Sequence, residues 1–231
     1  MSQTLAVTRI HFVRRELTFL RPIMIVVAAT LLSMLVYAVL FRFGIAGAGD
    51  ARYNAAQVYA LPGFYAYLGV AMVSTSFPFG LAVGATRRAY AGGTLIAYLA
   101  LSAYTTVLMT ALLGLELLTN HWFAGMYIFD VYALGAGDPV RCAITVFLAC
   151  LALLSVCGAF AASWIRFRGY GPVGIAVGVI VVGALTLLVA GPRIWDLFAG
   201  FRLWWLVVAA IVVSVLAQTG TYLFLRRANV R

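Results

Sequence analysis

Few side chains in this chain of 231 residues have the type and spacing that chemistry needs. The two histidines, His11 and His121, lie far apart in the sequence, so they do not suggest a metal or haem site. No serine lies in a recognisable nucleophile motif with a histidine partner. The chain contains no lysine, which excludes the Gly-Lys-Ser/Thr signature of a phosphate-binding loop. We therefore predict no catalytic, cofactor-binding or metal site, and no enzyme activity of the chain by itself.

Ionisable groups and thiols are also scarce inside the apolar segments. Glu116 lies near the outer end of one such segment, where we expect it to reach water or the interface. A channel or an intramembrane enzyme would need buried acids, histidines or a polar pore ring, and the sequence does not suggest one. Three cysteines, Cys142, Cys150 and Cys157, share one apolar segment, and we predict that they act as small apolar residues rather than disulfide partners.

Uncharged polar side chains cluster within three of the apolar segments. One interpretation is a translocation path for a largely apolar or amphiphilic substrate. The other is interhelical hydrogen bonding, worth about 0.6–2 kcal/mol per contact, and it is favoured for any individual residue. The residues assigned to the path are Ser74, Ser76, Thr106, Thr110 and Gln218.

The elements that must position these residues are long apolar runs. Hydrophobic residues make up 65% of the chain and charged residues 10%, which indicates an integral membrane protein. Six runs reach the roughly 20 residues needed to cross a bilayer, and they are continuous rather than alternating, which predicts helices and excludes a β-barrel. We predict an all-α, polytopic fold in which residues 1–231 form a single transmembrane domain. The predicted spans are 22–41, 58–80, 94–118, 140–164, 171–190 and 203–225.

The arginines encode the orientation of these spans. An even number of spans places both termini on one side, and that side holds 11 of the 16 basic residues but only one acid, Glu16. The positive-inside rule then predicts a multi-pass cell-membrane protein with both termini in the cytoplasm. Because the basic residues follow this pattern, we expect no nucleic-acid partner despite the net charge of +10.

Residues 1–21 are predicted to form an amphipathic interfacial helix before the first span. Ile10, Val13 and Leu17 recur at helical spacing while arginines lie on another face, a pattern typical of a helix that contacts membrane lipid. Pro22 favours a bend at the junction. The alternative is a cytoplasmic extension of the first spanning helix.

The most specific pattern lies in residues 77–116. An apolar helix ends in Gly-x-x-Arg-Arg-x-Tyr, passes through a small glycine-rich turn and re-enters the membrane. This stretch, and the layout of the whole chain, resemble the short six-span permease subunits of type-2 (ABC-2) ABC exporters of Gram-positive bacteria, actinobacteria included. The residues that carry the resemblance are Gly84, Arg87, Arg88, Tyr90, Gly92 and Gly93.

The resemblance implies how the chain works. It implies a translocation path shared with a second permease chain, as a homodimer or heterodimer, and a separate ABC ATPase subunit that carries ATP and Mg. Residues 84–93 would be the coupling segment that contacts this ATPase, a short helix with tight turns at Gly84 and at Gly92 and Gly93. In it, Arg87 and Arg88 would pair with acidic side chains of the ATPase, and Tyr90 would supply an apolar anchor. Gly174 and Gly178 would suit the dimer contact. Export is implied only by the resemblance, and drug, lipid, peptide and antibiotic substrates all remain open. The alternatives are the substrate-binding component of an energy-coupling-factor importer, or another small polytopic membrane protein.

Overall fold

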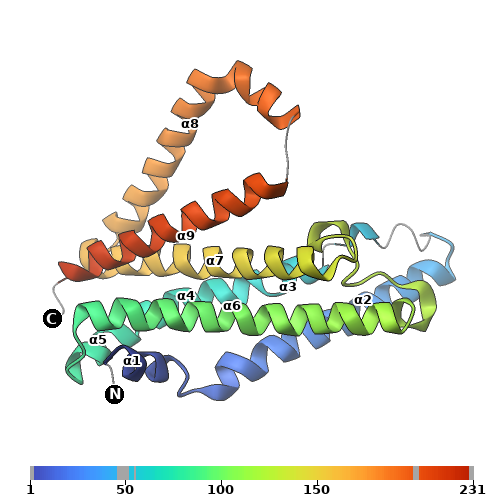
Figure 1. Cartoon of the computed structure of the whole chain (residues 1–231), viewed down its shortest axis with the longest axis horizontal. Coiled ribbons are helices and arrows are strands. Elements are labelled where there is room, and N and C mark those ends of the chain that lie inside the picture. The colour runs from blue at the N-terminus through green and yellow to red at the C-terminus, as the bar shows by residue number, and fades with distance from the viewer. Residues whose placement is uncertain (1–2, 46–51, 55, 200–202, 229–231) are drawn as a thin grey trace.

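The computed structural model describes residues 3–45, 52–54, 56–199 and 203–228. Within these residues the chain is helical and contains no β-strand (Figure 1). Six stretches are long and apolar enough to cross a membrane: Glu16–Arg42, Ala56–Ala82, Arg87–Leu118, Pro139–Phe167, Tyr170–Val189 and Trp204–Arg226. The predicted all-α fold with six spans is confirmed, and the chain is a multi-pass membrane protein.

The helices contain all six predicted spans. The principal helices are α1 (Gln3–His11), α2 (Arg21–Arg42), α3 (Ala56–Ala60), α4 (Pro62–Ser74), α5 (Ser76–Ala82), α6 (Arg87–Leu118), α7 (Pro139–Phe167), α8 (Tyr170–Ala199) and α9 (Leu203–Arg226). Two π-helical turns (Glu16–Leu20 and His121–Gly125) and a short 3₁₀ helix (Tyr132–Leu134) join them. The largest difference is at α8, which continues to Ala199, beyond the predicted end at residue 190. Helix α6 begins at Arg87, well before the predicted start at residue 94.

The second span consists of α3, α4 and α5 because two breaks interrupt it. Pro62 lies in the first turn of α4, where its missing N–H is tolerated. Thr75 separates α4 from α5, three residues before Pro78, whose ring opposes a helical bond to the carbonyl of Ser74. The Thr75 hydroxyl donates to the Ala71 carbonyl at 2.5 Å, a local bond that accompanies helix bends.

Helices α6 and α7 form the centre of the bundle, with α4 and α9 packed on α7 (Figure 1). A Cβ on Gly69 of α4 would lie 3.0 Å from the Leu154 carbonyl oxygen of α7, so a larger residue would push the two helices slightly apart. The buried Tyr98 hydroxyl of α6 donates to the Gly69 carbonyl at 3.1 Å, and Gly158 of α7 leaves room for its ring. These contacts fix α4, α6 and α7 relative to one another.

The N-terminal segment is not the single helix predicted for residues 1–21. Helix α1 ends at His11, residues 12–14 form a bend, and a π-helical turn then leads directly into α2. The predicted bend at Pro22 is wrong, since Pro22 lies in the first turn of α2, where its missing N–H costs little. Helix α1 packs against α5 and α6, and its position at a lipid interface stays a prediction.

Helix α8 leaves the bundle instead of packing along it (Figure 1). In its Tyr170–Val189 stretch, Gly171 at the start is buried, and every other residue is half-buried or exposed. The turn into α8 needs Gly171, because a Cβ there would lie 2.4 Å from the Ser163 carbonyl oxygen. Gly174 and Gly178 have no atom within 4 Å of a Cβ position, so they face open space, and their dimer contact stays a prediction.

Candidate functional site

The predicted coupling segment, residues 84–93, is a short turn followed directly by a long helix. Gly84 has a φ of +84°, a left-handed conformation that favours glycine. The Thr86 hydroxyl then caps α6 by accepting the Ala89 N–H at 3.2 Å. The separate short helix predicted here is wrong, because this N-cap starts α6 before the segment ends.

Gly92 and Gly93 lie inside α6 and do not form the predicted turn. Their missing side chains allow α1 to approach α6. A Cβ on Gly93 would lie 2.7 Å from Val7 Cβ, and one on Gly92 would lie 3.3 Å from the Thr4 methyl carbon. The Thr8 hydroxyl lies 3.2 Å from the Gly93 carbonyl, within hydrogen-bond distance. The glycine pair is therefore the docking surface for α1.

Tyr90 is fully buried, so the prediction that it offers an exposed apolar anchor to a partner is wrong. Its hydroxyl donates to the Met72 carbonyl of α4 at 2.5 Å. Its ring packs edge-on against Phe77 of α5 and His11 of α1, with centroid distances of 5.1 and 5.8 Å. Tyr90 therefore connects α6 to three other helices directly behind the turn.

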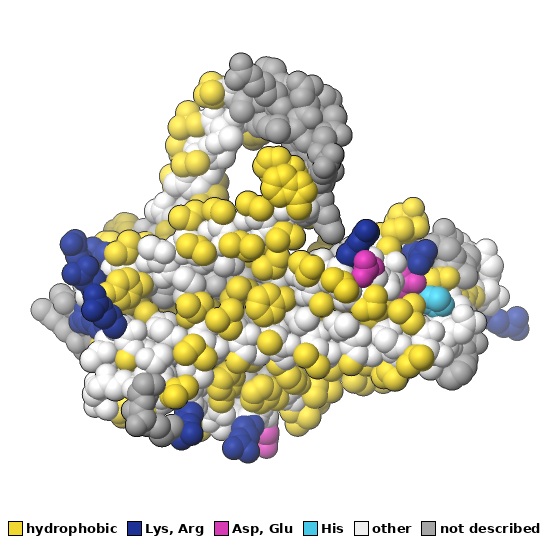
Figure 2. Space-filling view, viewed as in Figure 1, with side chains coloured by type: hydrophobic (Ala, Val, Ile, Leu, Met, Phe, Trp, Pro, Cys, Tyr) yellow, Lys and Arg dark blue, Asp and Glu magenta, His cyan; other side chains and the backbone are white. Residues whose placement is uncertain are grey.

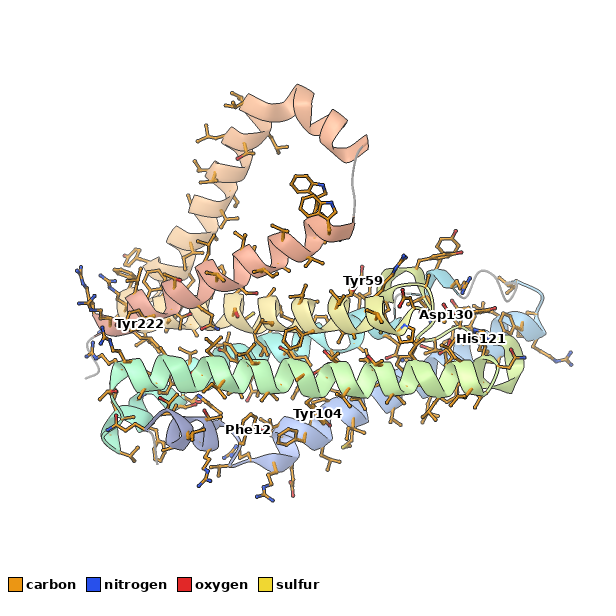
Figure 3. All side chains as sticks on the ribbon, viewed as in Figure 1. Phe12, Tyr59, Tyr104, His121, Asp130 and Tyr222 are labelled. Atoms are coloured by element: carbon orange, nitrogen blue, oxygen red, sulfur yellow. The ribbon has the colours of Figure 1, made fainter. Side chains whose placement is uncertain are left out.

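Arg87 and Arg88 lie at the start of α6, beside the last turn of α9. Arg87 Nη1 donates to the carbonyls of Leu225 and Arg226 at 3.1 and 2.5 Å. Carbonyls at a helix C-terminus lack partners within the helix and favour a positive charge. Arg88 is exposed, and its Nε donates to the Tyr222 hydroxyl at 3.2 Å (Figure 3). Both predicted coupling arginines thus bind α9, and Arg88 is the more exposed of the two.

His11 connects α1 to the helices on both sides of the turn. Its Nε2 lies 3.1 Å from the Thr94 hydroxyl of α6, and its Nδ1 lies 3.5 Å from the Ser76 hydroxyl of α5. The Thr94 hydroxyl donates its proton to the Tyr90 carbonyl at 2.9 Å, so it accepts from a protonated Nε2. Burial lowers the pKa of His11 to about 4, and the ring is therefore neutral at neutral pH.

The residues assigned to a translocation path are not brought together. Ser76 lines a cavity of about 600 Å³ between the N-terminal segment and helices α4 and α5. Ser74 lines a different cavity, of about 390 Å³, beside Phe160 and Trp164 of α7. A cavity of about 330 Å³ lies among α3, α4, α6 and α7, next to Gln57.

The other three path residues make contacts within or between helices. Thr106 donates to the Ser102 carbonyl of its own helix at 2.7 Å. Gln218 of α9 donates to the Ser155 hydroxyl of α7 at 3.1 Å. Thr110 of α6 lies beside the Cys142 thiol of α7. For Gln218 the alternative interpretation, an interhelical hydrogen bond, is confirmed. All three cysteines are free, as predicted.

Glu116 is buried at the far end of α6, so the expectation that it reaches water is wrong. Its carboxylate accepts the backbone N–H groups of Ile128, Phe129 and Asp130 at 3.1, 2.7 and 3.1 Å. It also accepts the indole N–H of Trp122 at 3.0 Å. The loop between α6 and α7 therefore wraps around one carboxylate, whose two oxygens meet all four donors.

Asp130 connects this loop to the segment before α3. Arg52 Nη2 donates to both carboxylate oxygens of Asp130 at 3.0 and 2.8 Å, and His121 Nε2 lies 3.1 Å from Oδ2 (Figure 3). The Arg52 guanidinium also lies 5.0 and 5.7 Å from the ring centroids of Tyr127 and Tyr132. The hydrogen bond to Asp130 raises the pKa of Arg52. These contacts hold the loop over the ends of the helices.

Sequence reasoning assigned no role to Arg52, Asp130 or Trp122. The available signal was an acid at the end of an apolar helix, Glu116, followed by a short loop with aromatic residues and a second acid. A second signal was a pair of opposite charges, Arg52 and Asp130, in two loops that the predicted spans place on the same side of the membrane.

The two ends of the bundle differ in charge. Figure 2 shows a group of arginine side chains at the end that carries the α5–α6 turn, and acidic and histidine side chains beside arginines at the opposite end. Residues from both chain ends, Val7 and Ala228, are buried in the same apolar cluster as Tyr90, so they lie at the arginine-rich end. No known protein family, curated protein or solved structure gives a significant match to this chain.

Proposed function

We propose that this chain is the permease subunit of an ATP-driven ABC exporter of the ABC-2 type. It lies in the cell membrane with both termini in the cytoplasm and forms the translocation path with a second permease chain. A separate ABC ATPase subunit binds ATP and Mg and docks at the α5–α6 turn. The motif of residues 77–116 and the concentration of arginines at one end of the bundle support this proposal.

The observation that carries the proposal is the rigid support behind the exposed α5–α6 turn. Val83 and Gly84 are exposed at the arginine-rich end. Directly behind them, Tyr90 binds α4, Arg87 binds the last turn of α9, and His11 binds α1 to α6. A displacement of the turn therefore moves several helices together. Such a coupled element is what a membrane subunit driven by a separate ATPase requires.

One observation favours the alternative, the substrate-binding component of an energy-coupling-factor importer. Such a component holds a small molecule in a pocket within one chain, and the cavity of about 330 Å³ beside Gln57 has the size of a small-molecule site. The two candidates differ in their partners. The exporter subunit contacts its ATPase directly, whereas the importer component needs a second transmembrane protein as a coupler.

Purification of the tagged chain from its native membrane separates these candidates. We expect an ABC ATPase bound directly to the chain and vanadate-sensitive ATP hydrolysis by the complex, with none by the chain alone. Val83→Asp changes an exposed residue of the turn and should release the ATPase, because a charge replaces an apolar contact. Phe43→Asp is the matched control and should retain the ATPase. Phe43 is similarly exposed and directly follows the C-terminal end of α2.

Two results would contradict the proposal. Robust ATP hydrolysis by the purified single chain would place the ATPase within it. An ATPase that binds only through a second transmembrane protein would establish the importer alternative instead.

A further inference from the structure

The cavity of about 600 Å³ lies where two irregular segments of the chain meet. One segment is the bend at residues 12–14, between α1 and the π-helical turn, and the other is the break between α4 and α5 at Thr75. Val13 and Phe79 of the cavity wall are exposed, whereas Leu68 and Met72 are buried. The cavity therefore leads from the surface into the bundle, and its volume is in the range that holds a small ligand.

Arg14 supplies the charge of this cavity. No acidic residue lines it, and the buried imidazole of His11 is neutral at neutral pH. The Arg14 side chain is exposed, and it forms no ion pair or hydrogen bond among the residues that the structure describes. Glu16, the acid closest to it in the sequence, does not line the cavity. The guanidinium N–H donors of Arg14 are therefore available to an anionic ligand.

The other polar groups of the wall are neutral. The hydroxyls of Thr18, Thr75 and Ser76 each donate to the carbonyl four residues earlier, at 3.0, 2.5 and 3.0 Å. The exposed Tyr67 hydroxyl has no partner within the described part of the chain, so it can bind a charged or an uncharged ligand alike. Arg14 is consequently the group that distinguishes an anionic ligand from a neutral one.

The rest of the wall is apolar and comes from both segments. Ile10 and Leu17 belong to the N-terminal segment, and Leu68, Met72 and Phe79 belong to α4 and α5. A small hydrophilic anion would leave this apolar surface in contact with water. An anion that carries an apolar tail pairs with the arginine and covers the apolar wall at the same time.

We propose that this cavity binds one anionic phospholipid, with its phosphate on Arg14 and part of one acyl chain along Leu68, Met72 and Phe79. The rest of the lipid extends past the exposed rim of the cavity. A membrane protein is surrounded by such lipids, and arginines attract their headgroups. The site belongs to the single chain, so it does not depend on the proposed function or on any ATPase.

The test compares two lipid probes on the purified full-length chain in detergent. One is a phosphatidylglycerol with a photoreactive diazirine in one acyl chain, and the other is a diacylglycerol with the same chains and no phosphate. After illumination, mass spectrometry measures the labelling of residues 10–18 and 67–79. We expect the phosphatidylglycerol to reach half-maximal labelling at a concentration about tenfold lower, because one charge-assisted contact separates the two lipids.

Three variants locate the effect. Arg14→Gln should bring the phosphatidylglycerol to the level of the diacylglycerol and leave the diacylglycerol unchanged. Arg15→Gln is the matched control, since it removes the same charge from the neighbouring exposed residue, which does not line the cavity, and it should preserve the difference. Ala71→Phe adds a ring to the cavity wall and should reduce labelling by both lipids.

An excess of glycerol 3-phosphate distinguishes a lipid from a soluble phosphate. Because this compound lacks the apolar tail, we expect it to leave labelling by the phosphatidylglycerol unchanged. Displacement of the lipid by glycerol 3-phosphate would overturn the proposal and would assign the cavity to a hydrophilic anion.

Equal labelling of the wild-type chain by the two lipids would also overturn the proposal. This comparison needs no variant, so it remains decisive if Arg14→Gln fails to fold. An equal loss of labelling in Arg14→Gln and Arg15→Gln would show attraction by the whole basic segment in place of a site at Arg14, and would overturn it too. None of these failures affects the ATPase experiment, since that experiment tests the α5–α6 turn.

Discussion

Replacing Glu116 by glutamine should destabilise the loop between α6 and α7. Oε1 of Glu116 accepts from the N–H groups of Ile128 and Asp130, and Oε2 accepts from Phe129 and from the Trp122 indole. Glutamine has the same shape but one oxygen and one NH₂ group. Whichever way the amide turns, its NH₂ faces about two N–H donors that it cannot accept. Each buried donor left unpaired costs about 1–3 kcal/mol, so the substitution costs about 2–6 kcal/mol.

Thermal unfolding of the purified chain, followed by tryptophan fluorescence, measures this cost. For a chain of this length, a loss of about 2 kcal/mol lowers Tm by about 4–8 °C, and larger losses lower it further. Glu16→Gln is the control, because Glu16 is exposed in the π-helical turn before α2 and should leave Tm unchanged. An unchanged Tm for Glu116→Gln would refute the reasoning, since the four N–H groups would then not depend on the carboxylate.

Three further outcomes follow from the N-terminal half of the chain. Lowering the pH from about 7 to about 5 should lower the free energy of unfolding by about 2 kcal/mol. The pKa of His11 is about 4 in the folded chain and 6.5 in the unfolded chain, so only the unfolded chain takes up the proton in this range. His11→Gln should flatten this pH dependence of Tm, and an unchanged slope would contradict the assignment. Gly93→Val should lower the free energy of unfolding by about 1–3 kcal/mol, because the added side chain forces α1 away from α6. Gly183→Val is the control, since a side chain there enters open space. Equal Tm values for the two variants would exclude the α1 contact. In a cysteine-free chain, Val83→Cys should react with a membrane-impermeant maleimide only after the cells are opened, and labelling of intact cells would invert the topology.

The six spans could be predicted because a bilayer imposes a length of about 20 apolar residues on each crossing helix. This length signal is strong, and it does not depend on what each helix contacts. The break at Thr75 was not predicted, although Pro78 was visible in the sequence. A proline removes one hydrogen bond, but neighbouring contacts decide whether the helix kinks, breaks or continues. Pro22 and Pro78 illustrate two of these outcomes within one chain.

The coupling segment was predicted less well, because glycine has two uses that sequence does not separate. Gly84 takes a left-handed turn, as expected for glycine between helices. Gly93 remains helical and allows α1 to approach within the distance that a Cβ would occupy. The burial of Tyr90 could not be predicted either, because it depends on α1, and nothing in the local pattern indicates where α1 docks.

In a membrane protein, apolar side chains report little about packing, because lipid accepts them as readily as a neighbouring helix does. Helix α8 is as apolar as the other spans, and yet most of its described span residues are exposed. Polar side chains carry the packing information instead, since each needs a partner that lipid does not provide. Glu116 finds four N–H groups in a loop that wraps around it, while Gln57 of α3 pairs its NH₂ group with Thr30 of α2. The pairing of buried polar groups, and not apolar periodicity, therefore shows which segments of this chain pack together.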